Sequence, residues 1–269
     1  GILNAPDPSF NPAEDEDLAR KFEPKNFVVG KKENKRHLQK KLGLIQDDHA
    51  PVFFWPSRLD PIQKGCQLLA DIFYKVISTY WNQNLQIVFV ANGDYQMVFR
   101  DIVNFHKIEK RVAIYDFSNR LEHLAYGAAD FILMPSRFEP CGLPQMIAPL
   151  YGTLPVAHDT GGIHDTITHL DVKKNTGNGF LFETFDANGL FWAIEQAMIF
   201  YNLPQKAKAK QIKRIMLESR ETFTHANTAR QYIKLYEKML ERPLVVENRS
   251  DTSSADLSQE SKSKPGSQN

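Results

Sequence analysis

A carboxylate and a set of turn-forming residues follow directly after an apolar run in the middle of the chain. Glu139 lies in the sequence SRFEPCGL, residues 136–143, which comes straight after FILMP at 131–135. Open α/β sheets bind their ligands at the carboxyl ends of their strands. The position of Glu139 therefore predicts a site, and its natural partner is a neutral hydroxyl donor such as a sugar. From spacing alone, Glu139 could equally be a helix N-cap or a first-turn acid that the helix dipole favours.

Two cations follow an earlier apolar run in the same way. Arg58 and Lys64 lie in SRLDPIQKG, residues 57–65, between an expected strand and an expected helix. Arg58 as a planar fork and Lys64 as a mobile point charge would clamp a diphosphate. Hydrogen bonds to charged groups are worth about 1.5–3 kcal/mol each, against about 0.3–1 kcal/mol for an anion at a helix N-terminus. We therefore expect Arg58 and Lys64 to bind phosphate more strongly than the free amides of the helix expected after Gly142. From position alone, the two cations could instead belong to a solvated turn.

A third turn follows another expected strand. Thr160, Gly161 and Gly162 stand after the run at 154–157. Two adjacent glycines allow the backbone to approach a ligand closely, although they also suit a simple turn. Because the carboxyl ends of parallel strands meet at one edge of a sheet, the three turns are expected to converge on one crevice.

The elements that position these turns alternate along the chain. Short β-branched and aromatic runs are followed by longer amphipathic patterns, which is typical of a parallel sheet covered by helices on both faces. We predict a doubly wound, Rossmann-like α/β domain over residues 50–202. The expected strands are 52–55, 86–90, 112–115, 131–134, 154–157 and 179–182, and the expected helices are 64–80, 95–107, 121–127, 143–151, 162–170 and 188–201.

The flanking segments differ in composition from this domain. Residues 1–49 are rich in proline and charge, with a helical pattern at 35–42, and are expected to form an interdomain connection with a leading helix. Two amphipathic helices, at 206–220 and 227–240 within 203–242, are too polar to stand alone and should pack back onto the domain or onto a partner. Residues 243–269 are predicted to be a disordered polar tail, because they hold too little apolar surface to offset the entropy of ordering.

Charge and cysteine content narrow the class of protein. A formal net charge of +1 provides no broad basic field, so neither nucleic acid nor an anionic membrane is an expected partner. Cys66 and Cys141 are too few for a disulfide framework and lack metal-ligand spacing, which favours a reducing, cytoplasmic compartment and no metal. No apolar run approaches the length of a membrane span. The sequence at Gly1 looks like the middle of a larger protein.

At this point the motifs closely resemble those of the bacterial glycogen synthases and plant starch synthases. The matching blocks run in the same order over about residues 4–240, and EPCGL at 139–143 is specific to these enzymes among retaining glycosyltransferases. The resemblance implies the C-terminal, nucleotide-binding half of a GT-B hexosyltransferase. Such enzymes transfer glucose from ADP-glucose to the nonreducing end of an α-1,4-glucan with retention of configuration and without a cofactor. A plant source would imply the plastid in place of the cytoplasm.

The resemblance also implies roles for individual residues. Arg58 and Lys64 would hold the diphosphate and stabilise the departing charge, while Glu139 would bind hydroxyls of the transferred glucose. Phe117 falls where the family often has a tyrosine stacked on adenine, although it could be a core residue after a strand. The remaining donor-binding positions would be Cys141, Gly142, Leu143, Pro144, Thr160, Gly161 and Gly162.

Three qualifications accompany these roles. Cys141 could be an inert buried thiol. Pro144 removes one amide from the helix start, although proline suits a first helical turn. His158 and Asp159 replace a basic pair that the family often carries before Thr160.

The largest departure from the family is the missing N-terminal half, with its Lys-Thr-Gly-Gly loop. We therefore expect these 269 residues to bind nucleotide weakly and not to turn over alone, because the acceptor wall of the cleft is absent. Two alternatives stay open. The donor could be UDP-glucose, or the acceptor could differ. The chain could also be a non-catalytic half-domain that binds glucan or a full-length synthase as a regulator.

Overall fold

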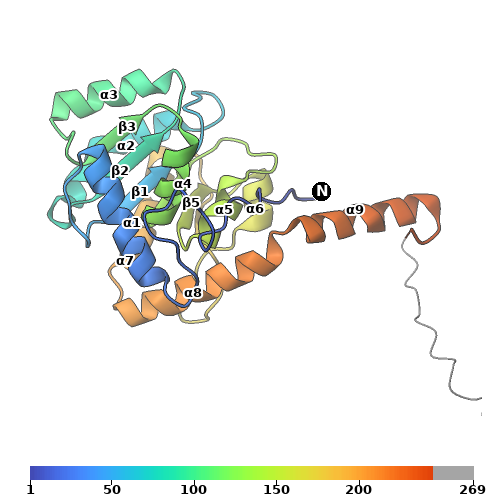
Figure 1. Cartoon of the computed structure of the whole chain (residues 1–269). Helices are drawn as coiled ribbons and strands as arrows, with labels where there is room; N and C mark the ends of the chain where they lie inside the picture. Colours follow the sequence, from blue (N-terminus) through green and yellow to red (C-terminus); the bar gives the residue numbers. More distant parts are fainter. Residues whose placement is uncertain (245–269) are drawn as a thin grey trace, which may run out of the picture. The chain divides into compact units, whose positions relative to one another are not determined.

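The centre of the molecule is a six-stranded sheet in which every neighbouring pair is parallel (Figure 1). The computed structural model describes residues 1–244, so the predicted tail lies outside the described residues except for its first two positions. The strand order is β3-β2-β1-β4-β5-β6, which confirms the doubly wound fold. The strands are β1 (Val52–Trp55), β2 (Gln86–Val90), β3 (Val112–Tyr115), β4 (Phe131–Met134), β5 (Leu154–His158) and β6 (Phe180–Phe182).

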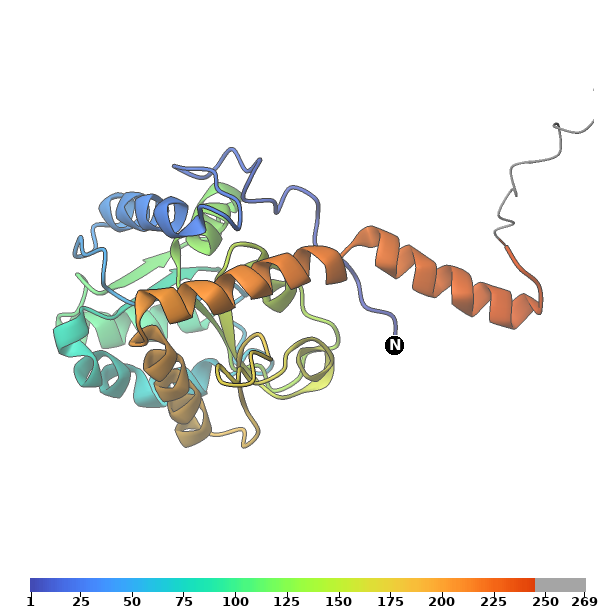
Figure 2. The same ribbon diagram turned by 90° about the horizontal axis from the view of Figure 1, so that it is seen from below.

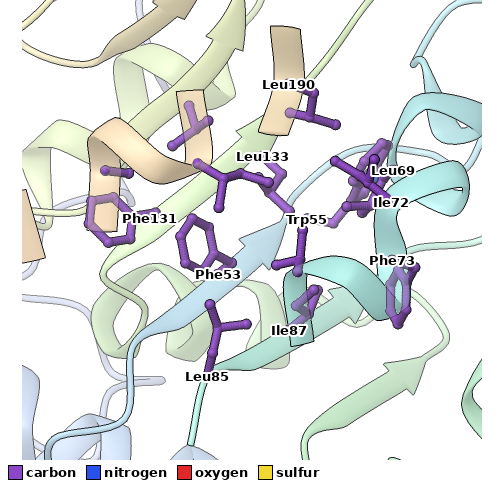
Figure 3. Packing of buried hydrophobic residues seen from close by; sticks show 14 of the residues in the cluster. Phe53, Trp55, Leu69, Ile72, Phe73, Leu85, Ile87, Phe131, Leu133 and Leu190 are labelled. Atoms are coloured by element: carbon purple, nitrogen blue, oxygen red, sulfur yellow. The ribbon is translucent and has the colours of Figure 1, made fainter. Parts of the chain in front are cut away.

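Side chains alternate between two hydrophobic clusters, one on each face of the sheet. In β1, Phe53 and Trp55 belong to one cluster, and Val52 and Phe54 belong to the other. Strand residues alternate in direction with a period of two, and a parallel sheet is covered on both faces, so continuous apolar runs are what such strands require. Figure 3 shows the first cluster, where Phe53, Phe131 and Leu133 pack beneath α7.

Helices cover both faces. Those packed in the cluster of Phe53 are α2, α3 and α7, and those packed in the cluster of Phe54 are α1, α4, α5 and α6. Their bounds are α1 (Phe27–Leu42), α2 (Cys66–Thr79), α3 (Tyr95–His106), α4 (Asn119–Ala128), α5 (Pro144–Leu150), α6 (Gly161–Thr166) and α7 (Ala187–Tyr201), with a short 3-10 turn, η1 (Trp81–Gln83).

Two helices, α1 and α6, differ from their predicted extent by more than two residues at one end. α1 begins eight positions earlier than expected, because the sequence FVVGKKEN has weak helix propensity and is helical through tertiary contacts. Lys31 Nζ in this part donates to Thr153 Oγ1 at 2.7 Å and to the Tyr151 carbonyl at 3.1 Å. α6 ends at Thr166, and the residues after it form isolated bridges instead of a further helical turn.

The leading segment is held against the domain by buried polar contacts. The Asp15 carboxylate accepts a hydrogen bond from Tyr151 Oη at 2.6 Å and lies 2.8 Å from His123 Nδ1. Phe22 is buried in the same cluster as Phe54. The leading segment therefore helps to cover the face of the sheet on which Phe54 lies.

The described residues fall into two units that divide between Thr228 and Ala229, and the C-terminal helices belong to both. In the first unit, α8 (Gln205–Thr222) follows α7 and buries Ile215 and Met216 in the two clusters (Figure 2). α9 (His225–Leu240), most of which lies in the second unit, has no buried residue among those described. Within residues 1–244, no helix has both the length and the apolar character needed to cross a membrane.

Candidate active site

Three loops that follow adjacent strands meet at one edge of the sheet. They join β1 to α2, β4 to α5 and β5 to α6. The Arg137 amide donates to the Gln63 carbonyl at 2.8 Å, and the Gly162 amide donates to the Glu139 carbonyl at 2.7 Å. The strand order reverses between β1 and β4, which is the switch point where open α/β sheets bind ligands. The structure therefore brings the three predicted turns together.

The glycines in these turns let one loop pack against the next. A Cβ on Gly162 would lie 2.1 Å from the Cys141 carbonyl oxygen, and one on Gly161 would lie 2.3 Å from that of Glu139. Gly161 also has a φ of +47°, in the left-handed region that favours glycine. From the sequence, these glycines were expected to let the backbone approach a ligand. In the structure they let it approach the backbone of the neighbouring loop, and Thr160 directly precedes them.

Lys64 and Glu139 form an ion pair, which the sequence reasoning missed. The Lys64 Nζ atom lies 2.6 Å from Glu139 Oε2, and their side chains are only 10% and 8% exposed. Ser136 Oγ donates to the same carboxylate oxygen at 3.1 Å. The alternative of a solvated turn is therefore wrong for Lys64. The alternative of an N-cap is wrong for Glu139, because the N-cap of α5 is Leu143.

Behind this pair, His158 joins two loops. Its Nδ1 lies 2.8 Å from the Ser136 carbonyl oxygen and its Nε2 lies 3.3 Å from that of Glu183. The imidazole is buried, so it supports the loop that carries Glu139. Sequence reasoning noted His158 only as a departure from the family, and the signal available was its position directly before Asp159 and the glycine turn.

Arg58 lies in the same loop as Lys64, at the wall of a pocket of about 520 Å³. Its guanidinium is exposed, and within residues 1–244 it makes no hydrogen bond or ion pair. The pocket is also lined by Asn92, Gly93 and Phe117. Phe117 is 53% exposed, so the alternative that it is a core residue is wrong.

Asn92 and Gly93 were not singled out from the sequence. The Asn92 side chain accepts a hydrogen bond from the Phe117 amide at 2.9 Å, which links the loops after β2 and β3. Both residues directly follow the apolar run of β2, as turn residues at a strand end should. That position was the signal available to find them.

The loop from Cys141 to Pro144 presents backbone more than side chains. Cys141 is only partly buried, so it is not the fully buried thiol of the alternative, and its carbonyl accepts from Gln145 Nε2 at 2.7 Å. Leu143 is exposed, and Gly142 precedes it with a left-handed φ of +75°. α5 starts with Pro144, and the amides of Met146 and Ile147 already donate to the Leu143 carbonyl. The helix start therefore offers fewer amides to an anion than the sequence suggested.

The arrangement can hold an anion next to a polyol. The β1–α2 loop carries an exposed guanidinium and a buried ammonium, and the β4–α5 loop carries a carboxylate that contacts both this ammonium and a hydroxyl. A hydrophobic ring at the wall of the adjacent pocket suits a flat aromatic ligand. The carboxylate is tied to an ammonium, so it is better placed to accept hydrogen bonds than to attack an electrophile.

Comparisons with known proteins all place this chain among glycosyltransferases. Residues 50–199 match the protein family described as "Glycosyl transferases group 1". The glycogen synthase of Bacillus cereus (strain Q1) is 32% identical over 245 residues, which are 90% of this chain and 49% of that protein. The chain thus spans about half the length of the relatives it matches.

Solved structures agree with this match. The catalytic domain of starch synthase IV from Arabidopsis thaliana, bound to ADP and acarbose, is 32% identical with a TM-score of 0.79, over 90% of this chain and 49% of that one. A glycosyltransferase from Rickettsia africae shares the fold at 18% identity and a TM-score of 0.65, over 89% of this chain and 56% of that one.

Proposed function

This chain belongs to the group 1 glycosyl transferases, and from that premise we propose that it is the donor-binding half of a glycogen or starch synthase. The complete enzyme transfers glucose from ADP-glucose to the nonreducing end of an α-1,4-glucan and retains the anomeric configuration. The observation that carries this proposal is the buried Lys64–Glu139 pair at the switch point of the sheet, with an exposed Arg58 in the same loop as Lys64. We place the enzyme in the cytoplasm, or in the plastid of a plant.

The diphosphate is held by the two cations. Arg58 has its guanidinium free of protein partners within residues 1–244, so it can meet phosphate oxygens as a fork. Lys64 exchanges part of its contact with Glu139 for the phosphate when the donor binds. As the bond to glucose breaks, negative charge grows on the diphosphate, and both cations stabilise that charge.

Glu139 binds the glucose. Its carboxylate accepts hydrogen bonds from Lys64 and Ser136, so a sugar hydroxyl is a suitable third partner for its remaining lone pairs. The acceptor hydroxyl approaches on the face from which the diphosphate leaves, and a phosphate oxygen takes its proton. No side chain of this chain has to serve as a nucleophile or general base.

The nucleotide base occupies the pocket at Phe117. A volume of about 520 Å³ is within the range of small-molecule sites, and the exposed ring of Phe117 can stack on adenine. The presence of ADP in the starch synthase IV structure supports adenine over uracil as the base. UDP-glucose is the competing donor.

Nucleotide binding by the purified chain tests this assignment. In titration calorimetry we expect ADP to bind more tightly than UDP. Phe117→Ala should weaken ADP binding about tenfold, because stacking on a base is worth about 1–3 kcal/mol. Phe105→Ala is the matched control, since Phe105 is 82% exposed on α3 and does not line the pocket. Equal effects of the two variants would contradict the assignment of the base pocket.

Glucose transfer tests the half-enzyme. The chain alone should not transfer glucose from ADP-glucose to glycogen, because the wall that would hold the acceptor belongs to the partner half. Fusion to the N-terminal half of a related synthase should restore turnover. Transfer by the chain alone would refute the half-enzyme proposal.

A further inference from the structure

A second pocket lies at the carboxyl ends of β5 and β6, beyond the loops of the candidate site. Its volume is about 600 Å³, and its wall includes Asp159, Glu183, Asn188 and Trp192. Asp159 directly precedes Thr160 in the glycine turn. The β6–α7 loop also reaches the candidate site, because a Cβ on Gly65 would lie 3.5 Å from the Phe185 ring. The pocket is therefore a neighbour of the site and shares none of the proposed donor contacts.

Trp192 forms an aromatic platform in this pocket. Its side chain is 45% exposed although it belongs to α7, and one ring face stacks on His169 at 5.6 Å between centroids and 30° between planes. His169 is itself fixed, since its Nδ1 accepts the Leu181 amide at 3.2 Å. An indole that is supported on one face and open on the rest suits a ligand with an apolar face and a polar rim.

The acidic groups around the platform are carboxylates, which accept hydrogen bonds. Asp159, Glu183 and Asp186 line the pocket, and neither lysine nor arginine occurs among its lining residues. Asp186 uses one oxygen to accept the Gly189 amide at 2.7 Å. Within residues 1–244, the Glu183 carboxylate has no hydrogen bond or ion pair. Asp159 lies 2.8 Å from His164 Nδ1, which does not line the pocket. With three carboxylates and neither lysine nor arginine in its wall, the pocket does not suit the nucleotide part of a donor.

A bound cation would be the other use of such carboxylates, and the spacing argues against it. Among residues 1–244, the only three potential metal ligands whose atoms lie within 4.8 Å of one another are Asp15, Asp17 and His123, which do not line this pocket. What remains is a neutral ligand with many hydroxyl donors and a flat apolar face. A pyranose ring has both.

We propose that this pocket is a glucan subsite, in which Trp192 stacks on a glucose unit and Glu183, Asp186 and Asn188 bind its hydroxyls. The inference rests on the proposed function, because it takes the α-1,4-glucan of that reaction as the ligand. A chain held here keeps its free ends close to the donor site, which raises their effective concentration. The subsite binds substrate and does not contact the reacting atoms.

Native gel electrophoresis in the presence of glycogen tests the subsite on the whole chain. Glycogen should retard the wild type, and Trp192→Ala should weaken the affinity derived from the retardation about tenfold, with Trp192→Phe intermediate. Trp81→Ala is the matched control, because Trp81 is also 45% exposed but stacks on Arg111 outside the pocket. Calorimetry with ADP is run on every variant and should give unchanged affinities.

The outcomes separate the subsite from the proposed function. Equal retardation of Trp192→Ala and wild type, or wild-type chain that binds ADP and migrates freely through glycogen, would overturn the subsite and leave the donor half intact. Failure of the wild type to bind ADP would count against the proposed function, while the glycogen gel still decides the subsite by itself. Loss of retardation in Trp192→Ala alone would establish it.

Discussion

The buried pair of Lys64 and Glu139 makes a quantitative prediction about stability. Removal of one partner of a buried ion pair costs about 3–5 kcal/mol, because the other charge is left unpaired, whereas an exposed pair contributes about 0.2–1 kcal/mol. These side chains are 10% and 8% exposed at a separation of 2.6 Å. Glu139→Gln keeps an acceptor for Ser136, so we expect the low end, a loss of about 3 kcal/mol in the free energy of unfolding.

A double-mutant cycle isolates the pair itself. Lys64→Met leaves Glu139 unpaired and should also destabilise the fold, while the double variant, Lys64→Met with Glu139→Gln, leaves neither charge. Its cost should fall short of the sum of the single costs by about 2 kcal/mol, which is the coupling energy. Urea unfolding followed by circular dichroism gives these values, provided that the m-value does not change. In a thermal scan, Glu139→Gln should lower Tm by about 6–12 °C.

An exposed pair provides the control. Lys25 and Glu23 lie 2.7 Å apart, with side chains 73% and 45% exposed. Glu23→Gln should therefore leave the urea midpoint close to that of the wild type. If Glu139→Gln behaved like Glu23→Gln, or if the coupling between Lys64 and Glu139 were below about 0.5 kcal/mol, the view of this pair as a buried structural link would be refuted.

Three further predictions concern the site and its supports. In a restored full-length enzyme, Arg58→Ala should lower kcat about 10²–10³-fold and change KM little, because the charge that Arg58 meets grows in the transition state; a raised KM with unchanged kcat would contradict this. The hydrogen bond to Asp15 raises the pKa of His123, so the stability it contributes is complete below its ordinary value of 6.5 and is lost as pH rises through the folded pKa. The urea concentration at the unfolding midpoint should accordingly decrease as the pH is raised from about 6 to about 9, and this decrease should be smaller in His123→Gln. Gly162→Ala places a Cβ 2.1 Å from the Cys141 carbonyl oxygen and should lower both Tm and the affinity for ADP, whereas a wild-type Tm would show that the two turns separate without cost.

Much of the fold follows from local patterns. Four of the six strands begin and end where the apolar runs predicted, because strands buried on both faces require uninterrupted apolar residues. The start of α1 did not follow, since residues 27–34 are helical only through contacts such as that of Lys31 with Thr153. Local propensity carries no information about such partners.

The candidate site, like the fold, was predictable from the sequence only in part. Its loops could be located from the chain alone, because turn residues and charges after an apolar run mark a strand end wherever that strand lies in the sheet. The 2.6 Å contact of Lys64 with Glu139, the position of His158 behind it and the packing of Gly162 on Cys141 arise only when β1, β4 and β5 become neighbours. Residue types therefore specify which groups are available for chemistry, and strand order decides which of them meet.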